Sequence, residues 1–188
     1  MKIAITGHSA GIGAALLKEY SAKGHTVIGL SRTNGHNIKD TQKIASIIEP
    51  CDMFINNAQE GFAQTELLYE MFRRWNGQPK QIVVISTQMT LMPYPSFNVM
   101  DMIPYYVQKQ ALEEMTKQLR QFGPAPSLTV VKPGATGKTT PAPGPKADVD
   151  LWAKNLIKCL EVDAPLRVSE ITLGLNYTKE NYYGNKTV

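Results

Sequence analysis

The feature that most constrains the fold is a regular alternation of short apolar runs with segments of helical periodicity. Most of the apolar runs lack strict apolar–polar alternation, which is typical of parallel strands covered on both faces. These runs occur at 2–6, 26–31, 53–56, 82–86, 128–132 and 169–175. The helical segments between them occupy 13–24, 41–49, 65–75, 105–122 and 148–160. This order predicts an α/β fold, a doubly wound parallel sheet with helices on both faces and right-handed crossovers.

The length and composition are those of one globular domain. The chain has 188 residues, of which 43% are hydrophobic and 19% charged, and a domain of this size buries a sizeable core without disulfides or metals. We therefore expect residues 1–188 to form a single domain. Two longer connections, 88–104 and the proline-rich 138–148, are expected to rim a substrate cleft.

Charge and special residue types argue against several other classes of protein. The net charge is +4, and no basic run of five or more residues occurs, so nucleic-acid binding is not expected. No stretch approaches 18 apolar residues and the N-terminus begins with a strand-like run, which favours a cytoplasmic protein without a signal peptide or membrane span. Cys51 and Cys159 have no nearby Cys or His, so we expect reduced thiols and no metal site.

A glycine-rich turn follows the first predicted strand. The sequence TGHSAGIG places Gly7, Gly11 and Gly13 between that strand and the next helix. Such a turn brings the backbone close to a phosphate, and the helix N-terminus supplies N–H donors and a positive potential. The spacing differs from the general dinucleotide fingerprint. Its position at the first strand-to-helix crossover nevertheless favours a phosphate cradle over an ordinary turn.

The end of the second predicted strand indicates which dinucleotide is bound. An acidic residue at this place commonly binds the ribose 2′-hydroxyl of NAD. This chain has Ser31 followed by Arg32, with no carboxylate beside them in the sequence. A guanidinium can pair with a 2′-phosphate, so NADP(H) is favoured over NAD(H). The competing interpretation is that Arg32 is merely solvated.

Four motifs together resemble the short-chain dehydrogenases/reductases. They are TGHSAGIG, NNAQ at 56–59, Tyr105 four residues before Lys109, and VKPG at 131–134, in the order and strand positions of that family. The resemblance covers about residues 2–140, and the last helix and strand also fit. It implies a Rossmann-like NAD(P)-binding domain that transfers a hydride to or from a small carbonyl or alcohol. It also implies a homo-oligomer, a dimer or tetramer, formed through the helix bearing Tyr105 and the helix before it.

The resemblance further implies a set of cofactor contacts. The glycine turn contributes Gly7, Ser9, Gly11, Ile12 and Gly13; the adenosine side Ser31, Arg32, Asn37, Asn57 and Ala58; the nicotinamide side Lys109, Pro133, Gly134 and Thr136. Thr139 is an alternative to Thr136. Gln59 stands where the family has glycine, a departure that indicates a narrower cofactor cleft.

The chemistry of hydride transfer gives the Tyr105–Lys109 pair a role. The cofactor carries the hydride, but the alkoxide that forms needs a proton from the protein. A lysine four residues further along a helix lies on the same face as the tyrosine, and its ammonium favours the phenolate and lowers the phenol pKa. Tyr106 projects about 100° away around the helix, so Tyr105 is the predicted acid. The competing interpretation is two packing tyrosines and a solvated lysine.

The substrate oxygen requires a hydroxyl at the end of a neighbouring strand. The resemblance assigns this role to Thr87, with Ser86 as its rival. Tyr105 follows Thr87 by 18 residues, more than is usual in the family, so the intervening residues are predicted to be an insertion at the cleft. Its apolar members, which could form a pocket rim or simply pack, are Met89, Met92, Tyr94, Phe97 and Met100.

One catalytic element of the family is missing from this sequence. The family has an asparagine on the helix before the active tyrosine, but 65–75 contains none and Asn76 lies in the turn after it. Water could substitute in the proton relay. The missing asparagine, the short helix and Gln59 favour a second function class, a redox-sensing or regulatory NADP(H)-binding protein with little catalysis. The Tyr105–Lys109 pair favours an enzyme.

Overall fold

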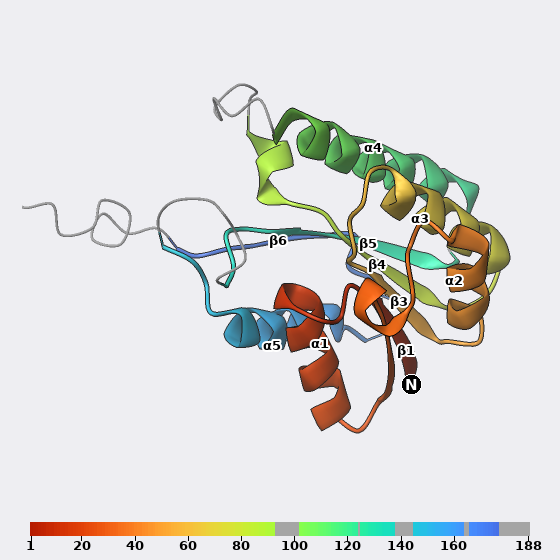
Figure 1. Ribbon diagram of the computed structural model, residues 1–188, viewed down its shortest axis with the longest axis horizontal. Coiled ribbons are helices and arrows are strands. Elements are labelled where there is room, and N and C mark those ends of the chain that lie inside the picture. The colour runs from red at the N-terminus through yellow and green to blue at the C-terminus, as the bar shows by residue number, and fades with distance from the viewer. Residues whose placement is uncertain (93–101, 124, 138–144, 164–165, 177–188) are drawn as a thin grey trace, which may run out of the picture.

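Six parallel strands form one sheet in a computed structural model that describes residues 1–92, 102–123, 125–137, 145–163 and 166–176 (Figure 1). The strands are β1 Lys2–Thr6, β2 Thr26–Leu30, β3 Met53–Asn56, β4 Gln81–Ile85, β5 Ser127–Pro133 and β6 Glu170–Leu173. Their order in the sheet is β2-β1-β3-β4-β5-β6, and every pair is parallel. The predicted Rossmann-like, doubly wound α/β fold is confirmed.

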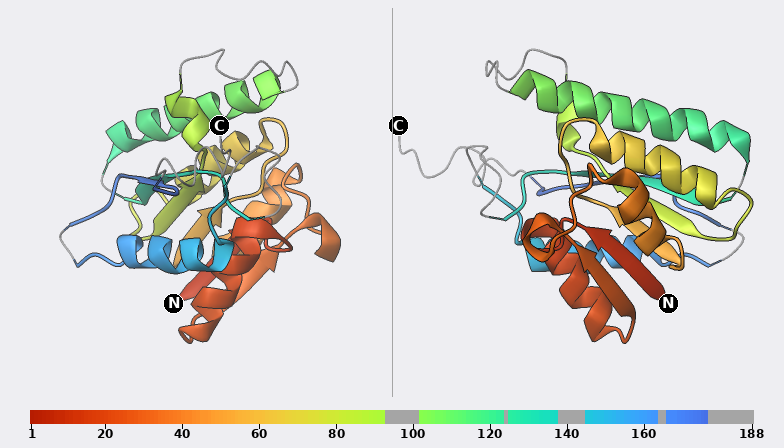
Figure 2. Two further views of the ribbon diagram at one scale, coloured as in Figure 1. Left: turned by 90° about the vertical axis from the view of Figure 1, so that its left-hand side faces the viewer. Right: turned by 45° about the vertical axis from the view of Figure 1, so that its right-hand side comes forward.

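The helices cover both faces of the sheet. Helices α1 Gly11–Ala22 and α5 Val149–Leu160 lie side by side on one face, whereas α2 Thr41–Ile48, α3 Ala63–Arg74 and α4 Ile103–Leu119 cover the other (Figures 1 and 2). Short 3-10 helices follow β2 (η1, Arg32–Asn34), β4 (η2, Gln88–Leu91) and α4 (η4, Arg120–Phe122). None of the helices within the described ranges is long and apolar enough to cross a membrane.

Two apolar layers hold the helices to the sheet. Between the sheet and helices α2, α3 and α4, the fully buried side chains include Phe54, Leu67 and Leu112. Between the sheet and helices α1 and α5, they include Ile5 and Leu156. Each such side chain contributes about 1.5–3 kcal/mol through removal from water. The periodicity that predicted the helices is therefore the periodicity of their buried faces.

Two buried stripes contain a polar side chain where an apolar one is expected. On α3, Gln64 precedes the buried Leu67 and Leu68 by three and four residues and is only 2% exposed. On α4, Lys109 precedes the buried Leu112 by three residues and is 3% exposed. Buried amides and ammonium groups require hydrogen-bond partners, so these two positions point to a polar site between α3, α4 and the sheet.

Several boundaries and loops differ from the sequence expectation. Helix α1 begins at Gly11, two residues before the predicted 13–24, so the last two glycines of the turn form its first turn. Helix α4 begins at Ile103 with Pro104 in its first turn and continues into η4. Of the connections at 88–104 and 138–148, residues 88–92, 102–104 and 145–148 are described. The predicted rim residues Tyr94, Phe97 and Met100, and Thr139, lie outside the described residues.

Candidate active site

The glycine turn lies where the strand order reverses, between the carboxyl ends of β1 and β3, which is where doubly wound sheets bind ligands. Gly7 and Gly11 have φ angles of +71° and +55°, in the left-handed region that favours glycine. A Cβ at Gly13 would lie 2.2 Å from the carbonyl oxygen of Gly7. The third glycine is therefore required because α1 approaches the end of β1 so closely.

Asn57 holds the turn against the neighbouring strand. Its Nδ2 donates to the carbonyl oxygens of Thr6 at 2.9 Å and Gly7 at 3.3 Å. The Thr6 hydroxyl accepts from the backbone N–H groups of Asn57 at 3.0 Å and Ala58 at 3.1 Å. These bonds hold the glycine turn against the end of β3. Asn57 and Ala58 therefore have a structural role in positioning the turn.

The N-terminus of α1 is suited to an anion. Its N-cap residue is Ala10, no side chain caps the helix, and its first turn has no acidic residue. The first backbone N–H groups of a helix have no partners within it, and they carry the positive end of the helix dipole. With the close approach at Gly13, this geometry fits the pyrophosphate of a dinucleotide.

A cavity of about 760 Å³ extends from this turn across the ends of β2 and β3. Its lining includes many of the predicted cofactor contacts, namely Gly7, Ser9, Ser31, Arg32, Asn37, Asn57 and Ala58. Gln59 also lines it, and its amide donates to Gln108 Oε1 on α4. The predicted contacts Gly11, Ile12 and Gly13 lie instead in the first turn of α1, and Pro133, Gly134 and Thr136 lie at the end of β5 and just beyond it.

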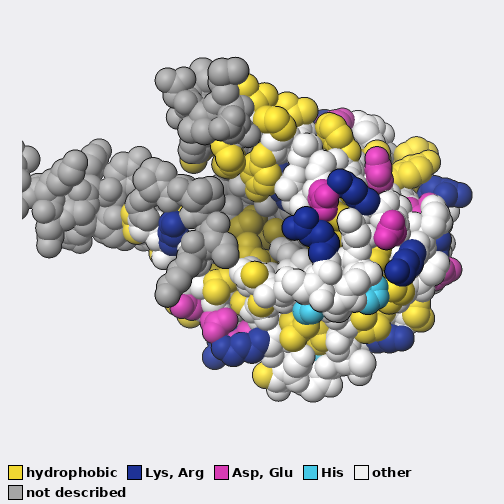
Figure 3. Space-filling view, in the orientation of Figure 1, with side chains coloured by type: hydrophobic (Ala, Val, Ile, Leu, Met, Phe, Trp, Pro, Cys, Tyr) yellow, Lys and Arg dark blue, Asp and Glu magenta, His cyan; other side chains and the backbone are white. Residues whose placement is uncertain are grey.

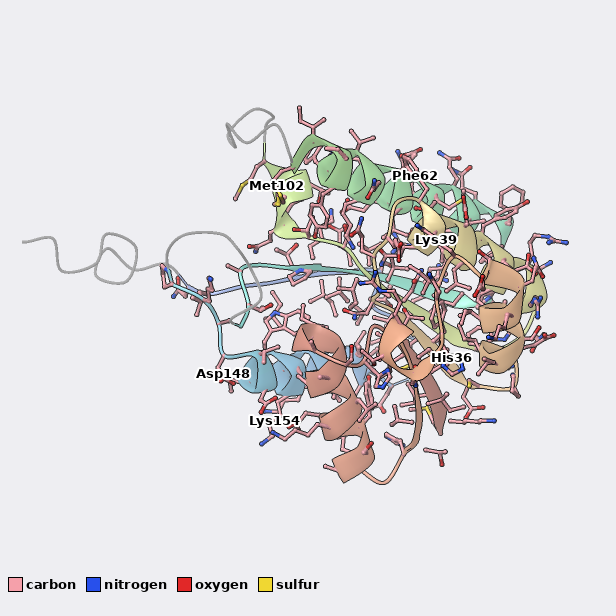
Figure 4. All side chains as sticks on the ribbon, in the orientation of Figure 1. His36, Lys39, Phe62, Met102, Asp148 and Lys154 are labelled. Carbon is pink, nitrogen blue, oxygen red and sulfur yellow. The ribbon has the colours of Figure 1, made fainter. Side chains whose placement is uncertain are left out.

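The charges at this cavity correct one expectation. Glu60, also in the cavity lining, pairs with Lys39 at 2.7 Å and with Arg32 at 3.8 Å. The hydrogen bond from Lys39 lowers the pKa of the Glu60 carboxyl, with a further contribution from Arg32. Figure 4 labels Lys39 and His36 on the segment after β2, and Figure 3 shows cationic and acidic side chains intermixed on this face. Arg32 thus has a neighbouring carboxylate that was not expected from the residues beside it in the sequence.

Tyr105 and Thr87 meet between α4 and the end of β4. The partly buried Tyr105 phenol shares a hydrogen bond with the Thr87 side chain. Burial raises the pKa of Tyr105 above 10.0 and the hydrogen bond with Thr87 lowers it in part. Desolvation of the phenolate is therefore the largest effect on the Tyr105 pKa in this structure, and the lowering expected from Lys109 together with a nicotinamide stays a prediction. Tyr106 instead accepts a hydrogen bond from Gln110 at 2.8 Å.

Ser86 belongs to a different cluster. It is 2% exposed, and its hydroxyl donates to Glu113 Oε1, which also accepts from Thr90 Oγ1 at 2.8 Å. Glu113 pairs with Lys132 at 3.2 Å, and Lys132 pairs with Glu170 at 2.8 Å. Of the two predicted hydroxyls, Thr87 is the one that contacts Tyr105.

Lys109 lies beneath the site with its ammonium group in the interior. Its Nζ donates to Gln64 Oε1 at 2.9 Å and to the Ile85 carbonyl at 2.8 Å, and it lies 5.6 Å from the centroid of the Tyr105 ring. Burial lowers the pKa of Lys109 to about 7, partly opposed by the charge of Glu113. The competing interpretation of a solvated lysine is wrong.

The sequence reasoning missed Gln64 because it searched 65–75 for an asparagine. A polar residue at a position of the apolar stripe of α3 was the available signal. Asn76, by contrast, is exposed just after α3, near the start of β4 at the opposite edge of the sheet.

At the end of β5, three segments approach one another closely. A Cβ at Gly134 would lie 2.7 Å from Gln88 Oε1 and 3.1 Å from the Gly174 Cα. Thr136 is 5% exposed and pairs through its backbone with Ala147. The segment after Pro133 is therefore held against β6 and η2 rather than against the cavity lining.

The fold is that of the short-chain dehydrogenases/reductases. A short-chain dehydrogenase from Burkholderia cenocepacia, solved in complex with NADP, matches with a TM-score of 0.75 at 18% identity, over 93% of this chain and 88% of that one. A short-chain dehydrogenase/reductase from Vibrio parahaemolyticus matches with a TM-score of 0.72 at 19% identity, over 91% and 98%.

An alcohol dehydrogenase from the archaeon Thermococcus sibiricus, complexed with 5-hydroxy-NADP, matches with a TM-score of 0.70 at 16% identity, over 97% of this chain and 100% of that one. No protein-family model and no curated protein match the sequence. The likeness is therefore carried by the arrangement of the elements and not by sequence identity.

Proposed function

We propose that this chain is an NADP(H)-dependent oxidoreductase that reduces a small carbonyl compound. The observation that carries the proposal is that two features lie at the same edge of the sheet. One is the glycine turn with its cavity, which suit a dinucleotide. The other is the Tyr105–Thr87 pair above the buried Lys109. The solved structures with bound NADP or 5-hydroxy-NADP that share the fold support a nicotinamide cofactor.

The turn and the cavity fit such a cofactor. The uncapped N-terminus of α1 would hold the pyrophosphate, and the cavity beside Arg32 and Asn37 would hold the adenosine. When bound, the nicotinamide supplies or takes up the hydride. The protein has to bind and orient the reactants and move the proton.

The state of Tyr105 favours reduction of a carbonyl. Because burial raises its pKa, the phenol is protonated near neutral pH and can give its Oη proton to the substrate oxygen. Thr87 Oγ1, which already bonds the phenol, can hold the same oxygen. The Lys109 ammonium near the Tyr105 ring favours the phenolate that remains after the proton has left.

Turnover with a panel of small aldehydes and ketones and NADPH tests this assignment. Tyr105→Phe removes the acidic proton, and we expect the rate to fall about 100-fold or more. Tyr106→Phe is the matched control, because the Tyr106 hydroxyl accepts from Gln110 at 2.8 Å and belongs to the neighbouring tyrosine of the same helix, and its rate should stay within about twofold. Equal rates for wild type and Tyr105→Phe would exclude Tyr105 as the acid.

The preference for NADP(H) depends on the balance between Arg32, Lys39 and Glu60. Arg32 is largely exposed and can turn toward a 2′-phosphate, whereas the Glu60 carboxylate opposes that phosphate. We expect Arg32→Gln to weaken NADPH binding about tenfold more than NADH binding, measured by fluorescence titration. Glu60→Gln, the matched neutral variant, should strengthen NADPH binding. Equal effects on both cofactors would contradict the assignment.

One observation favours a second function, cofactor binding with little catalysis. The Lys109 Nζ bonds to groups of the protein interior and is almost fully buried. A redox-sensing or regulatory protein of this fold would bind NADPH tightly and turn over none of the carbonyl panel. The same titration and turnover measurements distinguish the two functions.

We also propose that the chain forms a homodimer through α3 and α4. Tyr69 on α3, Val107 on α4 and Phe62 just before α3 are each close to half exposed. Stable interfaces bury about 800 Å² on each partner and are enriched in aromatic residues. Light scattering after gel filtration should give twice the monomer mass, and Tyr69→Glu should give the monomer. An unchanged mass in that variant would place the interface elsewhere.

A further inference from the structure

Gln64 connects four elements of the fold beneath the Tyr105–Thr87 pair. It lies in the first turn of α3, and its Nε2 donates to the Asn56 carbonyl of β3 at 2.7 Å and to the Ile85 carbonyl of β4 at 3.1 Å. Its Oε1 accepts from Lys109 of α4 at 2.9 Å. The Asn56 side chain donates back to the Gln64 carbonyl at 2.9 Å. Every polar atom of the Gln64 side chain thus has a partner.

The orientation of this amide follows from its neighbours. Carbonyl oxygens only accept hydrogen bonds and an ammonium only donates them. The nitrogen of the amide must therefore face the two strand carbonyls, and its oxygen must face Lys109. Flipping the amide would place its oxygen against two carbonyls and its N–H groups against the ammonium, losing all three bonds.

A second buried lysine shows what the charge of the partner does. The Lys132 ammonium is paired with two carboxylates, Glu113 and Glu170, and their hydrogen bonds raise its pKa although burial opposes them. Lys109 has two neutral acceptors, and its pKa is lowered to about 7. The two pKa values move in opposite directions because burial dominates at Lys109, whereas at Lys132 the two carboxylates outweigh the effect of burial.

The groups that face Lys109 come from its own helix and from α3 and β4. From its own helix, Glu113 and the Tyr105 phenol face it, and Glu113 is already bound by Lys132 of β5. The groups that contact Lys109 from α3 and β4 are the Gln64 amide and the Ile85 carbonyl, both neutral. The position of the ammonium therefore depends on acceptors that do not cancel its charge.

We propose that Gln64 is a positioning residue for the reaction, holding the Lys109 Nζ beneath Tyr105 through a neutral amide oxygen. This inference rests on the proposed function, and it specifies which residue of α3 supports the lysine. A carboxylate at position 64 would bind Lys109 equally closely but would hold the proton on Lys109 to a higher pH. An apolar side chain of the same length would leave Lys109 without this acceptor.

The test measures the titration of Lys109 directly and then its effect on turnover. In protein labelled with ¹³C at the lysine Cε, the Lys109 signal is assigned by its loss in Lys109→Met and followed from pH 5.5 to 10. We expect Gln64→Glu to move the Lys109 midpoint upward by about one pH unit or more. The pH profile of kcat should move with it, while the NADPH Kd stays within about twofold. Gln78→Glu, which adds the same charge at the opposite edge of the sheet, should move neither.

Because Gln64→Glu also loses the two N–H donors, Gln64→Met serves as a second variant. It should lower kcat by about tenfold or more with little change in the NADPH Kd, and it should not raise the Lys109 midpoint. A Lys109 midpoint unmoved in Gln64→Glu, or a wild-type kcat and pH profile in Gln64→Met, would overturn the inference. If the midpoint moves as expected but wild type reduces no carbonyl, the proposed function is refuted and the Gln64–Lys109 coupling stands.

Discussion

The Lys109→Met variant is expected to change how the stability of the chain depends on pH. Lys109 has a pKa of about 7 in the folded chain against its ordinary value of 10.5. Between these values the unfolded chain binds a proton on this lysine that the folded chain has lost, so the free energy of unfolding rises with pH. The slope approaches about 1.4 kcal/mol per pH unit, which gives about 2–3 kcal/mol between pH 7.5 and 9.5. Methionine has no proton to lose, and its variant lacks this rise.

Urea unfolding without cofactor, followed by the fluorescence of the buried Trp75 and Trp152, measures the effect. The quantity of interest is the unfolding free energy of wild type minus that of Lys109→Met, because all other titrating groups contribute to both chains. The difference should increase with pH across the range. Lys154→Met removes the same charge from the exposed face of α5 and should run parallel to wild type. Parallel curves for wild type and Lys109→Met would refute a buried lysine of lowered pKa.

Three further variants test the cradle, the oxygen-binding hydroxyl and the core. Gly13→Ala places a Cβ against the Gly7 carbonyl and should weaken NADPH binding about 100-fold or more by titration, whereas an unchanged Kd would show that the close approach is not needed. Thr87→Val should lower kcat about 100-fold at an NADPH Kd within about twofold, with Thr87→Ser retaining most activity; equal kcat values for the two would exclude the hydroxyl. Leu67→Ala should cost about 2–5 kcal/mol of stability in urea against about 0.5 or less for the exposed Leu151→Ala, and similar losses would place Leu67 outside the core.

The elements and their order could be predicted because their causes are local. A strand covered on both faces needs a continuous apolar run, and a helix packed on a sheet needs an apolar stripe, so the chain displays both periodicities directly. The glycines of the first turn were identifiable for the same reason, since left-handed φ angles and a 2.2 Å approach leave room for no side chain. Helix ends were displaced by a few residues, because capping depends on contacts made after folding.

The candidate site was only partly predictable because its parts come from distant segments. The Tyr105–Lys109 spacing fixes one helix face, but it does not reveal that Lys109 faces inward to Gln64, 45 positions earlier in the chain. The pairing of Arg32 with Glu60 likewise could not be predicted, because the two residues follow β2 and β3 and come together only when these strands lie on either side of β1. Polar residues on apolar stripes were the signal of buried chemistry that the sequence offered.

By itself, then, the sequence determined the alternation of strands and helices, the glycine turn and the identity of the tyrosine–lysine pair, since each depends on residues close together in the chain. The tertiary structure decided which hydroxyl meets Tyr105, which amide holds Lys109 and in which direction their pKa values move. Those properties depend on desolvation and on partners contributed by other elements. Neither exists until the sheet and its helices have packed.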